Sequence, residues 1–420
     1  MKNVTCLFFY GALLISSYAF TVKNAAAESA SEIHAAISAS VEENRDDLIA
    51  FRRDLHQHPE VSGREERTAR KVTEELKALG FTVTTNVGGH GVVALLEGAK
   101  PGPLVAFRAD MDAVNSNWPD PVEFSSLRPG VRHVCGHDIH TTIGVALAHG
   151  FAANRDDIAG SVLLIFQPAE ETASGARDML ASTTLFNDNP PDAIFAYHTA
   201  PYETGIIATA RTRLMVARDR IRITLSATDS LGPIANDIKA RLEALATVTN
   251  PRTSQPLDSD FVHIDGVRAS IDNNGSSIVQ TFASLATDKA RADLRASVGD
   301  IIATTKAAHP DLVISSTYDA EYIPGVLNDP QLVEQAVHSA QEILDGDSII
   351  FVEQTPPTFS EDFGHFQKQA PGVMFFLGVS NQENGWRGYP HTPDYVADEE
   401  AIFVGANVMS KIMLDVLSSD

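Results

Sequence analysis

Apolar strands that alternate with helices make up much of residues 81–200, and this pattern sets the strongest limit on the fold. Strand-like runs occupy residues 81–85, 91–96, 104–110, 161–166 and 193–197, with helical segments at residues 141–148 and 175–180. Such alternation predicts an α/β fold, a mostly parallel sheet flanked by helices. Ligands bind at the carboxyl ends of the strands in these sheets, so the polar residues found there are candidate site residues.

The pattern changes at residue 216 and returns near residue 323, which predicts an inserted domain. Residues 220–225 alternate like a strand with one exposed face. Helices and strands of α+β type follow at residues 236–248, 260–267, 278–285, 288–308 and 312–318, and α/β-type segments resume at residues 329–344, 348–353, 362–368 and 372–378. We expect one domain in two parts, residues 28–215 and 323–420, interrupted by a smaller α+β domain at residues 216–322.

The first 27 residues resemble a secretory signal peptide. Lys2 supplies the positive start, Val4–Phe20 is largely apolar, and Ala25–Ala27 offers a small-residue cleavage site. A membrane anchor is the weaker alternative, because polar residues such as Ser16 interrupt a short apolar run. We expect a periplasmic or secreted protein with no membrane contact after signal removal. The formal net charge of −23 argues against nucleic acid as a partner.

The segment from His133 to His140 is dense in residues that hold transition metals: five of its eight residues are Cys, His or Asp. In extended backbone Cys135 and His137 point the same way, and Gly136 lets the chain fold close to an ion. The only other cysteine, Cys6, lies in the proposed signal, so the exported chain could form no intramolecular disulfide. Metal ligation would account for the remaining thiol; a buried inert thiol and a catalytic nucleophile are the alternatives.

Further ligand-type residues recur at predicted strand ends and in one distant loop. They are Asp110, Asp112, Glu170, Glu171, His198 and His391. Together with Cys135 and His137 they are too many for a structural zinc site, which is closed by four ligands. The set suits two metals about 3.5–4 Å apart that serve one hydrolytic water.

Six motifs in order resemble the metal-dependent amidohydrolases of the aminoacylase/carboxypeptidase clan. Within it, the chain is most similar to the N-acyl-amino-acid amidohydrolases, hippurate hydrolases and auxin-conjugate hydrolases. The motifs lie at residues 51–60, 107–113, 133–140, 166–171, 360–363 and 391–393. The resemblance implies a zinc-peptidase-like catalytic domain and an inserted lid domain through which two copies of the chain form a homodimer.

The resemblance also implies roles for individual residues. Two divalent ions, zinc or manganese with cobalt or nickel as further options, would be bound by Cys135, His137, Glu171, His198 and His391. Glu170 would be the general base that moves a proton from water to the leaving amine of a small amide substrate. Asp112 would orient a ligand histidine. Asp110 stands where the wider clan has a histidine ligand, so it is not expected to bind metal.

Other polar residues have plainer expected roles. We expect His56 and His58 to shape a turn and the pocket wall, and His133 and His140 to support the ligands. Glu361 and Asp362 would line the site or cap the following helix. His149, His309, His338 and His365 are expected to be surface or structural residues. Packing in the core or a loop is expected for Trp386, and a place in the substrate pocket is the alternative.

The inserted domain departs from the relatives. They carry a histidine soon after the first inserted strand and later an asparagine and an arginine that meet a substrate carboxylate. Residues 226–233 contain no histidine, and residues 272–277 and 281–286 contain no arginine. We therefore expect an exported dinuclear amidohydrolase with an unusual substrate or lowered activity. The alternatives are a metal-containing binding or regulatory protein of the same fold, and a hydrolase that uses Cys135 as nucleophile.

Overall fold

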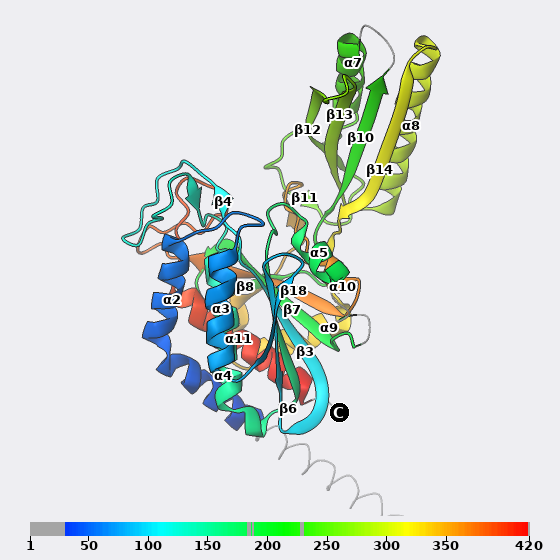
Figure 1. Cartoon of the computed structure of the whole chain (residues 1–420). Coiled ribbons are helices and arrows are strands. Elements are labelled where there is room, and N and C mark those ends of the chain that lie inside the picture. The colour runs from blue at the N-terminus through cyan, green and yellow to red at the C-terminus, as the bar shows by residue number, and fades with distance from the viewer. Residues whose placement is uncertain (1–29, 183–185, 187–188, 227–230, 419–420) are drawn as a thin grey trace, which may run out of the picture.

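The computed structural model describes residues 30–182, 186, 189–226 and 231–418, so the predicted signal at residues 1–27 lies outside the described residues. These residues form a large part built on an eight-stranded sheet and a smaller part that projects from it (Figure 1). Within the described ranges, no helix is both long and apolar enough to cross a membrane.

The large sheet is mostly parallel at its centre. Its strand order is β1 (Thr82–Val87), β2 (Gly91–Glu97), β6 (Ala159–Gln167), β3 (Lys100–Asp110), β7 (Ala193–Glu203), β18 (Gly372–Ser380), β8 (Ile207–Thr209) and β16 (Ile349–Phe351). β6, β3, β7 and β18 run parallel to one another, and β16 runs parallel to β8. The pairs β1–β2, β2–β6 and β18–β8 are antiparallel. The predicted α/β fold class is confirmed.

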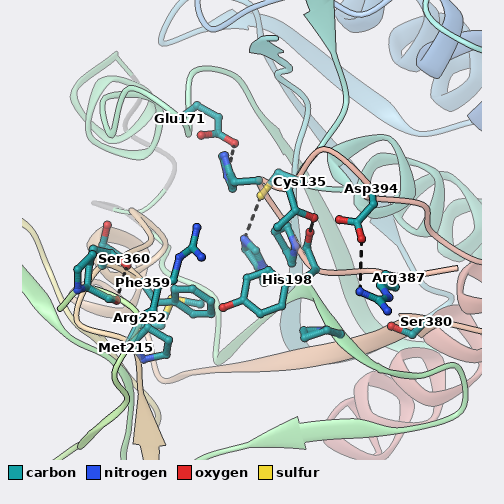
Figure 2. A pocket seen from close by; sticks show the side chains of 18 of the residues that line it. Cys135, Glu171, His198, Met215, Arg252, Phe359, Ser360, Ser380, Arg387 and Asp394 are labelled. Atoms are coloured by element: carbon teal, nitrogen blue, oxygen red, sulfur yellow. Dashed lines mark hydrogen bonds and ion pairs between the residues drawn. The ribbon is translucent and has the colours of Figure 1, made fainter. Parts of the chain in front are cut away.

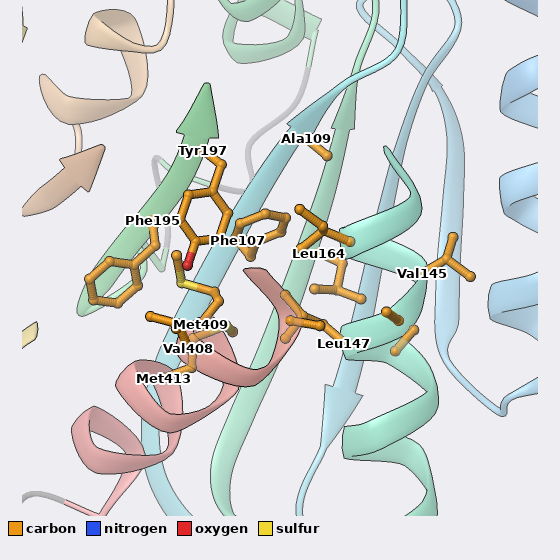
Figure 3. Close-up of a cluster of buried hydrophobic side chains, with 14 of the residues drawn as sticks. Phe107, Ala109, Val145, Leu147, Leu164, Phe195, Tyr197, Val408, Met409 and Met413 are labelled. Carbon is orange, nitrogen blue, oxygen red and sulfur yellow. The ribbon is translucent and has the colours of Figure 1, made fainter. Parts of the chain in front are cut away.

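Helices cover both faces of this sheet. The first face packs against α2 (Arg45–Gln57), α3 (Glu66–Ala78), α4 (His137–Ala153), α9 (Pro330–Gln341) and α11 (Glu400–Leu417). The second face packs against α5 (Gly175–Ser182) and α10 (Gly364–Gln367). Successive side chains of a strand point to opposite faces of the sheet, so the core consists of two hydrophobic clusters, one on each face. Phe107 and Ala109 of β3 belong to the cluster on the first face, and Ala106 belongs to the cluster on the second face. Figure 3 shows the first cluster, with Phe107 and Tyr197 between β-strands and α11.

Several element boundaries differ from the sequence predictions. α4 begins at His137, four residues before the predicted helix, because Gly136 takes a left-handed conformation (φ 85°) that turns the chain directly into the helix. β7 continues past the predicted end at residue 197, so His198 lies within the strand. α7 (Leu231–Glu243) begins and ends five residues earlier than predicted. The long helix α11 was not predicted; it is apolar on nearly all sides and almost wholly buried.

The smaller part has its own sheet and core. Its antiparallel sheet has the order β12 (Val262–Ile271), β13 (Ser277–Leu285), β10 (Ala217–Ser226) and β14 (Val313–Ile323). α7 and α8 (Asp288–Ala308) pack on one face, and residues such as Ile223, Val279 and Leu294 form a separate hydrophobic cluster. Residues 217–323 therefore form a distinct unit, which projects away from the large sheet in Figure 1.

Short strand pairs join the two parts. Where the chain enters and leaves the smaller part, β9 (Arg213–Met215) pairs with β15 (Val326–Leu327). A second link forms where β11 (Gln255–Pro256), from the inserted segment, pairs with β17 (Gln354–Thr355). β4 (Val114–Asn115) pairs with β5 (Val131–Arg132), and two single-turn 3₁₀ helices occupy Arg155–Asp157 and Gly346–Ser348.

Candidate active site

The metal-ligand motif lies at the carboxyl edge of the parallel strands, where α4 begins. A side chain at Gly136 would bring its Cβ to 2.4 Å from the Tyr395 hydroxyl and from Thr199 Cγ2, so only glycine fits this turn. His391 arrives from a distant loop. Its backbone N–H donates to the Val134 carbonyl at 2.8 Å, and its φ of 57° turns the chain into the site.

All five predicted metal ligands come together. The Cys135 sulfur lies 3.4 Å from His198 Nε2, and His391 Nε2 lies 3.2 Å from Glu171 Oε1. The donor atoms form two groups, each within 4.8 Å: Cys135 with His137 and His198, and Cys135 with Glu171 and His391. Because the groups share Cys135, two ions could be held next to each other. Figure 2 shows Cys135, His198 and Glu171 facing one cavity.

Asp112 holds two of these ligands in place. Its Oδ1 lies 3.2 Å from His137 Nδ1, and its Oδ2 accepts from Ser62 Oγ at 2.6 Å and from the Glu171 backbone N–H at 3.0 Å. A carboxylate on Nδ1 leaves Nε2 of His137 as the free ring nitrogen. That Nε2 is buried without a hydrogen-bond partner, 3.9 Å from Glu170 and 4.0 Å from Glu171.

The electrostatics of the group are those of a cation site. Burial raises the pKa of the Cys135 thiol, but His198, His391 and His137 outweigh burial and hold the pKa well below its usual value. The thiolate in turn raises the pKa of His391 to about 11, and against the opposing effect of burial it raises that of His198 to about 9. Protons on imidazole thus balance the negative ligands. Divalent ions can take the place of these protons, so the residues present fit a pair of metals.

Glu170 has the environment of a proton carrier. Burial, followed by the nearby Glu361 and Glu171 carboxylates, raises the pKa of Glu170 well above its usual value. Its side chain lines the cavity beside the proposed ligands. A raised pKa is the direction of shift that suits a carboxyl group for general acid–base catalysis.

Sequence reasoning assigned no role to Arg108, although it lies in one of the quoted motifs. Its buried guanidinium contacts three carboxylates, Asp110 at 2.7 Å, Glu361 at 2.8 Å and Asp362 at 3.1 Å, and donates to Gln167 at 2.8 Å. A charged residue inside an apolar strand was the available signal. Arg108 therefore balances the acidic residues behind Glu170.

The other acidic candidates have structural partners. Asp110 is held by Arg108 and by His140 Nδ1 at 2.6 Å, so both oxygens are engaged. Glu361 accepts from the Phe363 N–H at 3.1 Å and Asp362 from the Ala176 N–H at 3.0 Å. Neither residue is among those that line the cavity.

Three histidines outside the proposed ligand set, His56, His133 and His140, are buried behind the site. His56 lies 2.8 Å from Asp138 and 3.1 Å from Asp120, which places it behind the site instead of in the cavity wall. His58 is bonded to the Asp54 carbonyl. His140 Nε2 accepts from the Thr199 N–H at 2.9 Å, so the ring bridges two strands. Burial lowers the pKa of His133 to about 4, which keeps it neutral. The four histidines expected to be surface or structural residues, His149, His309, His338 and His365, are exposed or partly exposed and lie outside the cavity lining.

A second residue without a predicted role is Glu65. It is fully buried, and its Oε1 accepts from the backbone N–H groups of Gly63 and Ala169, each at 2.8 Å. Ala169 has a left-handed φ of 54° directly before Glu170. Glu65 therefore fixes the turn that presents Glu170. Nothing in its local sequence signals this contact.

The ligands open into a cavity of about 1150 Å³. Glu170, Glu171, Cys135, His198 and His391 contribute to its lining. Trp386 is 37% exposed and lies in the loop after β18, where it lines the cavity, so it belongs to a loop and not to the core, and it has the pocket position given as the alternative. Further lining residues come from both parts of the molecule, among them Phe359, Tyr389, Arg218, Arg252 and Arg387.

The fold and this side-chain set define a class of protein, the metal-dependent hydrolases that act on amide bonds. A family model described as Peptidase family M20/M25/M40 matches residues 106–415. The chain belongs to this family, and the resemblance drawn from the six motifs is confirmed.

Individual relatives agree with this assignment. Thermostable carboxypeptidase 2 of Saccharolobus solfataricus is 30% identical over 383 residues, which cover 87% of this chain and 94% of that protein. N-acetylcysteine deacetylase of Bacillus subtilis is 28% identical over 400 residues, 89% of this chain and 97% of that protein. The crystal structure of the Bacillus subtilis YXEP protein, described as a dinuclear metal binding peptidase from the M20 family, matches with a TM-score of 0.73 at 27% identity. It covers 90% of this chain and 99% of that one.

Proposed function

We propose that this chain hydrolyses the amide bond of N-acyl amino acids or related small amides and peptides, with two divalent ions at the Cys135 site. The observation that carries the proposal is the clustering of five ligand-type side chains, four of which line one cavity together with Glu170. A pure binding site has no need for an additional buried carboxyl group whose pKa is raised.

In the proposed hydrolysis each group has a separate role. Divalent ions held by Cys135, His137, Glu171, His198 and His391 would polarise the substrate carbonyl and make water a stronger nucleophile. Glu170 takes a proton from the attacking water as its oxygen bonds to the carbonyl carbon. Glu170 then gives that proton to the amine nitrogen as the carbon–nitrogen bond breaks, which yields a carboxylic acid and an amine. The acid then passes its own proton to the amine or to solvent and leaves as a carboxylate. Asp112 holds His137 and the Glu171 backbone in position throughout.

Names of the relatives support a small amide substrate. One is called an N-acetylcysteine deacetylase and another a carboxypeptidase. Zinc or manganese are the metals that we propose, with cobalt and nickel as options, since thiolate and imidazole ligands suit several of them.

Export and assembly are further parts of the proposal. Residues 1–27 would direct the chain to the periplasm or beyond, and the domain at residues 216–322 would join two copies of the chain. Amino-terminal sequencing of the exported protein and sedimentation of the purified chain test these two statements.

The test of the function is hydrolysis of a panel of N-acyl amino acids and dipeptides by the purified, metal-loaded chain. We expect release of free amine from some members, loss of this activity after chelation and recovery when divalent ions are returned. If the chain still hydrolyses these compounds after chelation has removed its bound metal, the proposal is contradicted and Cys135 is favoured as a nucleophile. Metal binding without hydrolysis of any member would favour the binding-protein alternative.

A further inference from the structure

Thr199 follows the proposed ligand His198 in β7 and is itself buried. Three of its polar groups make contacts around the metal-ligand motif. Its hydroxyl donates to the Cys135 carbonyl at 2.5 Å, its own carbonyl lies 2.8 Å from His198 Nδ1, and its backbone N–H donates to His140 Nε2 at 2.9 Å. A single residue therefore connects two proposed ligands and one supporting histidine.

The contact with His198 decides which of its ring nitrogens can face an ion. A carbonyl oxygen only accepts hydrogen bonds, so His198 Nδ1 carries the proton that is donated to Thr199. Nε2 is then the nitrogen that can bind a metal. It lies 3.4 Å from the Cys135 sulfur, a contact drawn as a dashed line in Figure 2. The Thr199 carbonyl thus orients Nε2 of His198 toward Cys135.

The hydroxyl of Thr199 holds the other ligand from its backbone side. Cys135 is buried, and a buried carbonyl needs a hydrogen-bond donor. Thr199 supplies this donor from β7 to the turn that precedes α4, where Gly136 has its left-handed φ. Because the peptide unit that joins Cys135 to Gly136 is planar, a fixed carbonyl also fixes the direction in which the Cys135 side chain leaves the backbone.

The third contact links Thr199 to Asp110. A backbone N–H is a donor, so His140 Nε2 accepts and His140 Nδ1 carries the proton. That Nδ1 lies 2.6 Å from Asp110 Oδ1, and Asp110 is also paired with Arg108 at 2.7 Å. The buried chain Asp110–His140–Thr199 therefore anchors β7 at the residue that contacts both ligands.

Resting on the two-ion site of the proposed function, we propose that Thr199 is a positioning residue, which fixes the Cys135 sulfur and Nε2 of His198 in the arrangement that binds a metal ion. Thr199 is not among the residues that line the cavity, so it acts through the two ligands. Removal of a group that orients a metal ligand typically costs about tenfold to hundredfold in metal affinity.

Cobalt(II) provides the test, because a cobalt ion bound to a thiolate absorbs through charge transfer from sulfur, and this band reports the geometry at Cys135. Thr199→Val keeps the shape and both backbone contacts but removes the hydroxyl, and Thr199→Ser keeps the hydroxyl. Cobalt affinity is measured by competition with a chelator, and urea unfolding gives the stability of each metal-free variant.

Thr209→Val is the matched control. Thr209 is also a buried threonine in a strand, and its hydroxyl donates to the Met374 carbonyl at 2.8 Å, away from the cavity lining. Its replacement removes the same kind of hydrogen bond from the sheet without touching a proposed ligand. It therefore separates a loss of stability from a loss of positioning.

We expect Thr199→Val to weaken cobalt binding about tenfold to hundredfold and to weaken or shift the charge-transfer band. Thr199→Ser should retain most of the affinity, and Thr209→Val should keep both affinity and band although it loses stability. An unchanged affinity and band in Thr199→Val, or an equal loss in Thr209→Val, would overturn the proposal. Thr199→Ala takes the place of Thr199→Val should the latter not fold, because alanine sets no methyl group against the Cys135 carbonyl.

Failure of the two-ion function has a different signature. The intact chain would then bind no cobalt, or bind it without a thiolate band. Crystal structures of the metal-free intact and Thr199→Val chains still decide the role of Thr199 in that case. We expect the Cys135 sulfur to move away from His198 Nε2 in the variant, and an unchanged separation of 3.4 Å would contradict the positioning role.

Discussion

At the scale of single residues, the adjacent Glu170 and Glu171 have different surroundings. The Glu171 carboxylate lies 3.2 Å from His391 and belongs with Cys135 to a potential metal group. Glu170 groups with the Glu361 and Asp362 carboxylates as well as with His137 and Glu171, so it lies between the acidic cluster and the proposed ligands. We therefore propose that Glu171 serves as a metal ligand and its sequence neighbour Glu170 as the proton carrier.

This difference predicts two distinct mutant behaviours. Glu170→Gln should retain bound metal and lose about 10²–10⁴-fold in kcat, the usual contribution of a general base. Glu171→Gln should lose metal as well as activity, because it removes a charged ligand. Metal analysis and steady-state kinetics on both variants check this. Equal metal loss in the two variants would contradict the assigned roles.

At the scale of elements, the turn into α4 depends on Gly136. Gly136→Ala should destabilise the chain by at least about 2 kcal/mol, because a Cβ there combines an unfavourable φ with overlap onto Tyr395 and Thr199. Gly80 is a matched control, with the same φ of 85° and nothing within 4 Å of an added Cβ. Urea unfolding should give the smaller loss for Gly80→Ala. Similar losses for both would show that crowding at Gly136 is unimportant.

Glu65 links the segment before α3 to the turn that carries Glu170, and it should make stability depend on pH. Burial and the nearby Asp112 raise the pKa of Glu65 to about 7. Between its ordinary pKa of 4.5 and about 7 the folded chain holds a proton that the unfolded chain releases, so stability falls as pH rises through this window. The shift corresponds to at most about 3 kcal/mol.

Glu65→Gln should flatten this part of the stability profile of the metal-free chain, because a neutral amide has no proton to lose. Denaturant unfolding at pH 5 and pH 7 measures the difference. Glu66→Gln, at the exposed neighbouring position, is the control and should keep the profile of the unmodified chain. A profile that Glu65→Gln leaves unchanged would rule out Glu65 as its source.

Elements with a clear periodic pattern were predictable, and those defined by tertiary contacts were not. The predicted helix at residues 288–308 coincides with α8, whose one buried stripe faces the small sheet. α11 was not predicted, because a helix that is buried on nearly all sides lacks the alternation of polar and apolar faces from which a helical period is recognised. The partners of Arg108 come from the β6 end and the segment before α10, so only the fold reveals its network.

At the scale of the whole molecule, the candidate ligands come from segments far apart in the chain. Cys135 and His137 lie at the start of α4, Glu171 follows β6, His198 is in β7, and His391 comes from the loop before α11. Bound ions would cross-link these segments. Binding to the folded chain alone raises its stability in proportion to the logarithm of the ratio of free ion to Kd.

Metal loading should therefore raise the thermal midpoint of unfolding, by an amount equivalent to about 2.7 kcal/mol at a free ion concentration one hundred times Kd. Scanning calorimetry with and without a divalent ion measures this. Cys135→Ala, which removes the residue shared by both ligand groups, should lose most of the increase. An unchanged midpoint in the loaded chain would mean that the site does not bind the ion in the folded state.

The central claim is a two-ion centre organised by Cys135, and elemental analysis of the purified, metal-reconstituted chain tests it most directly. We expect about two divalent ions per chain, and the content of both should decrease when Cys135 is replaced by alanine. A chain that binds no divalent metal, or whose metal content does not depend on Cys135, would contradict it.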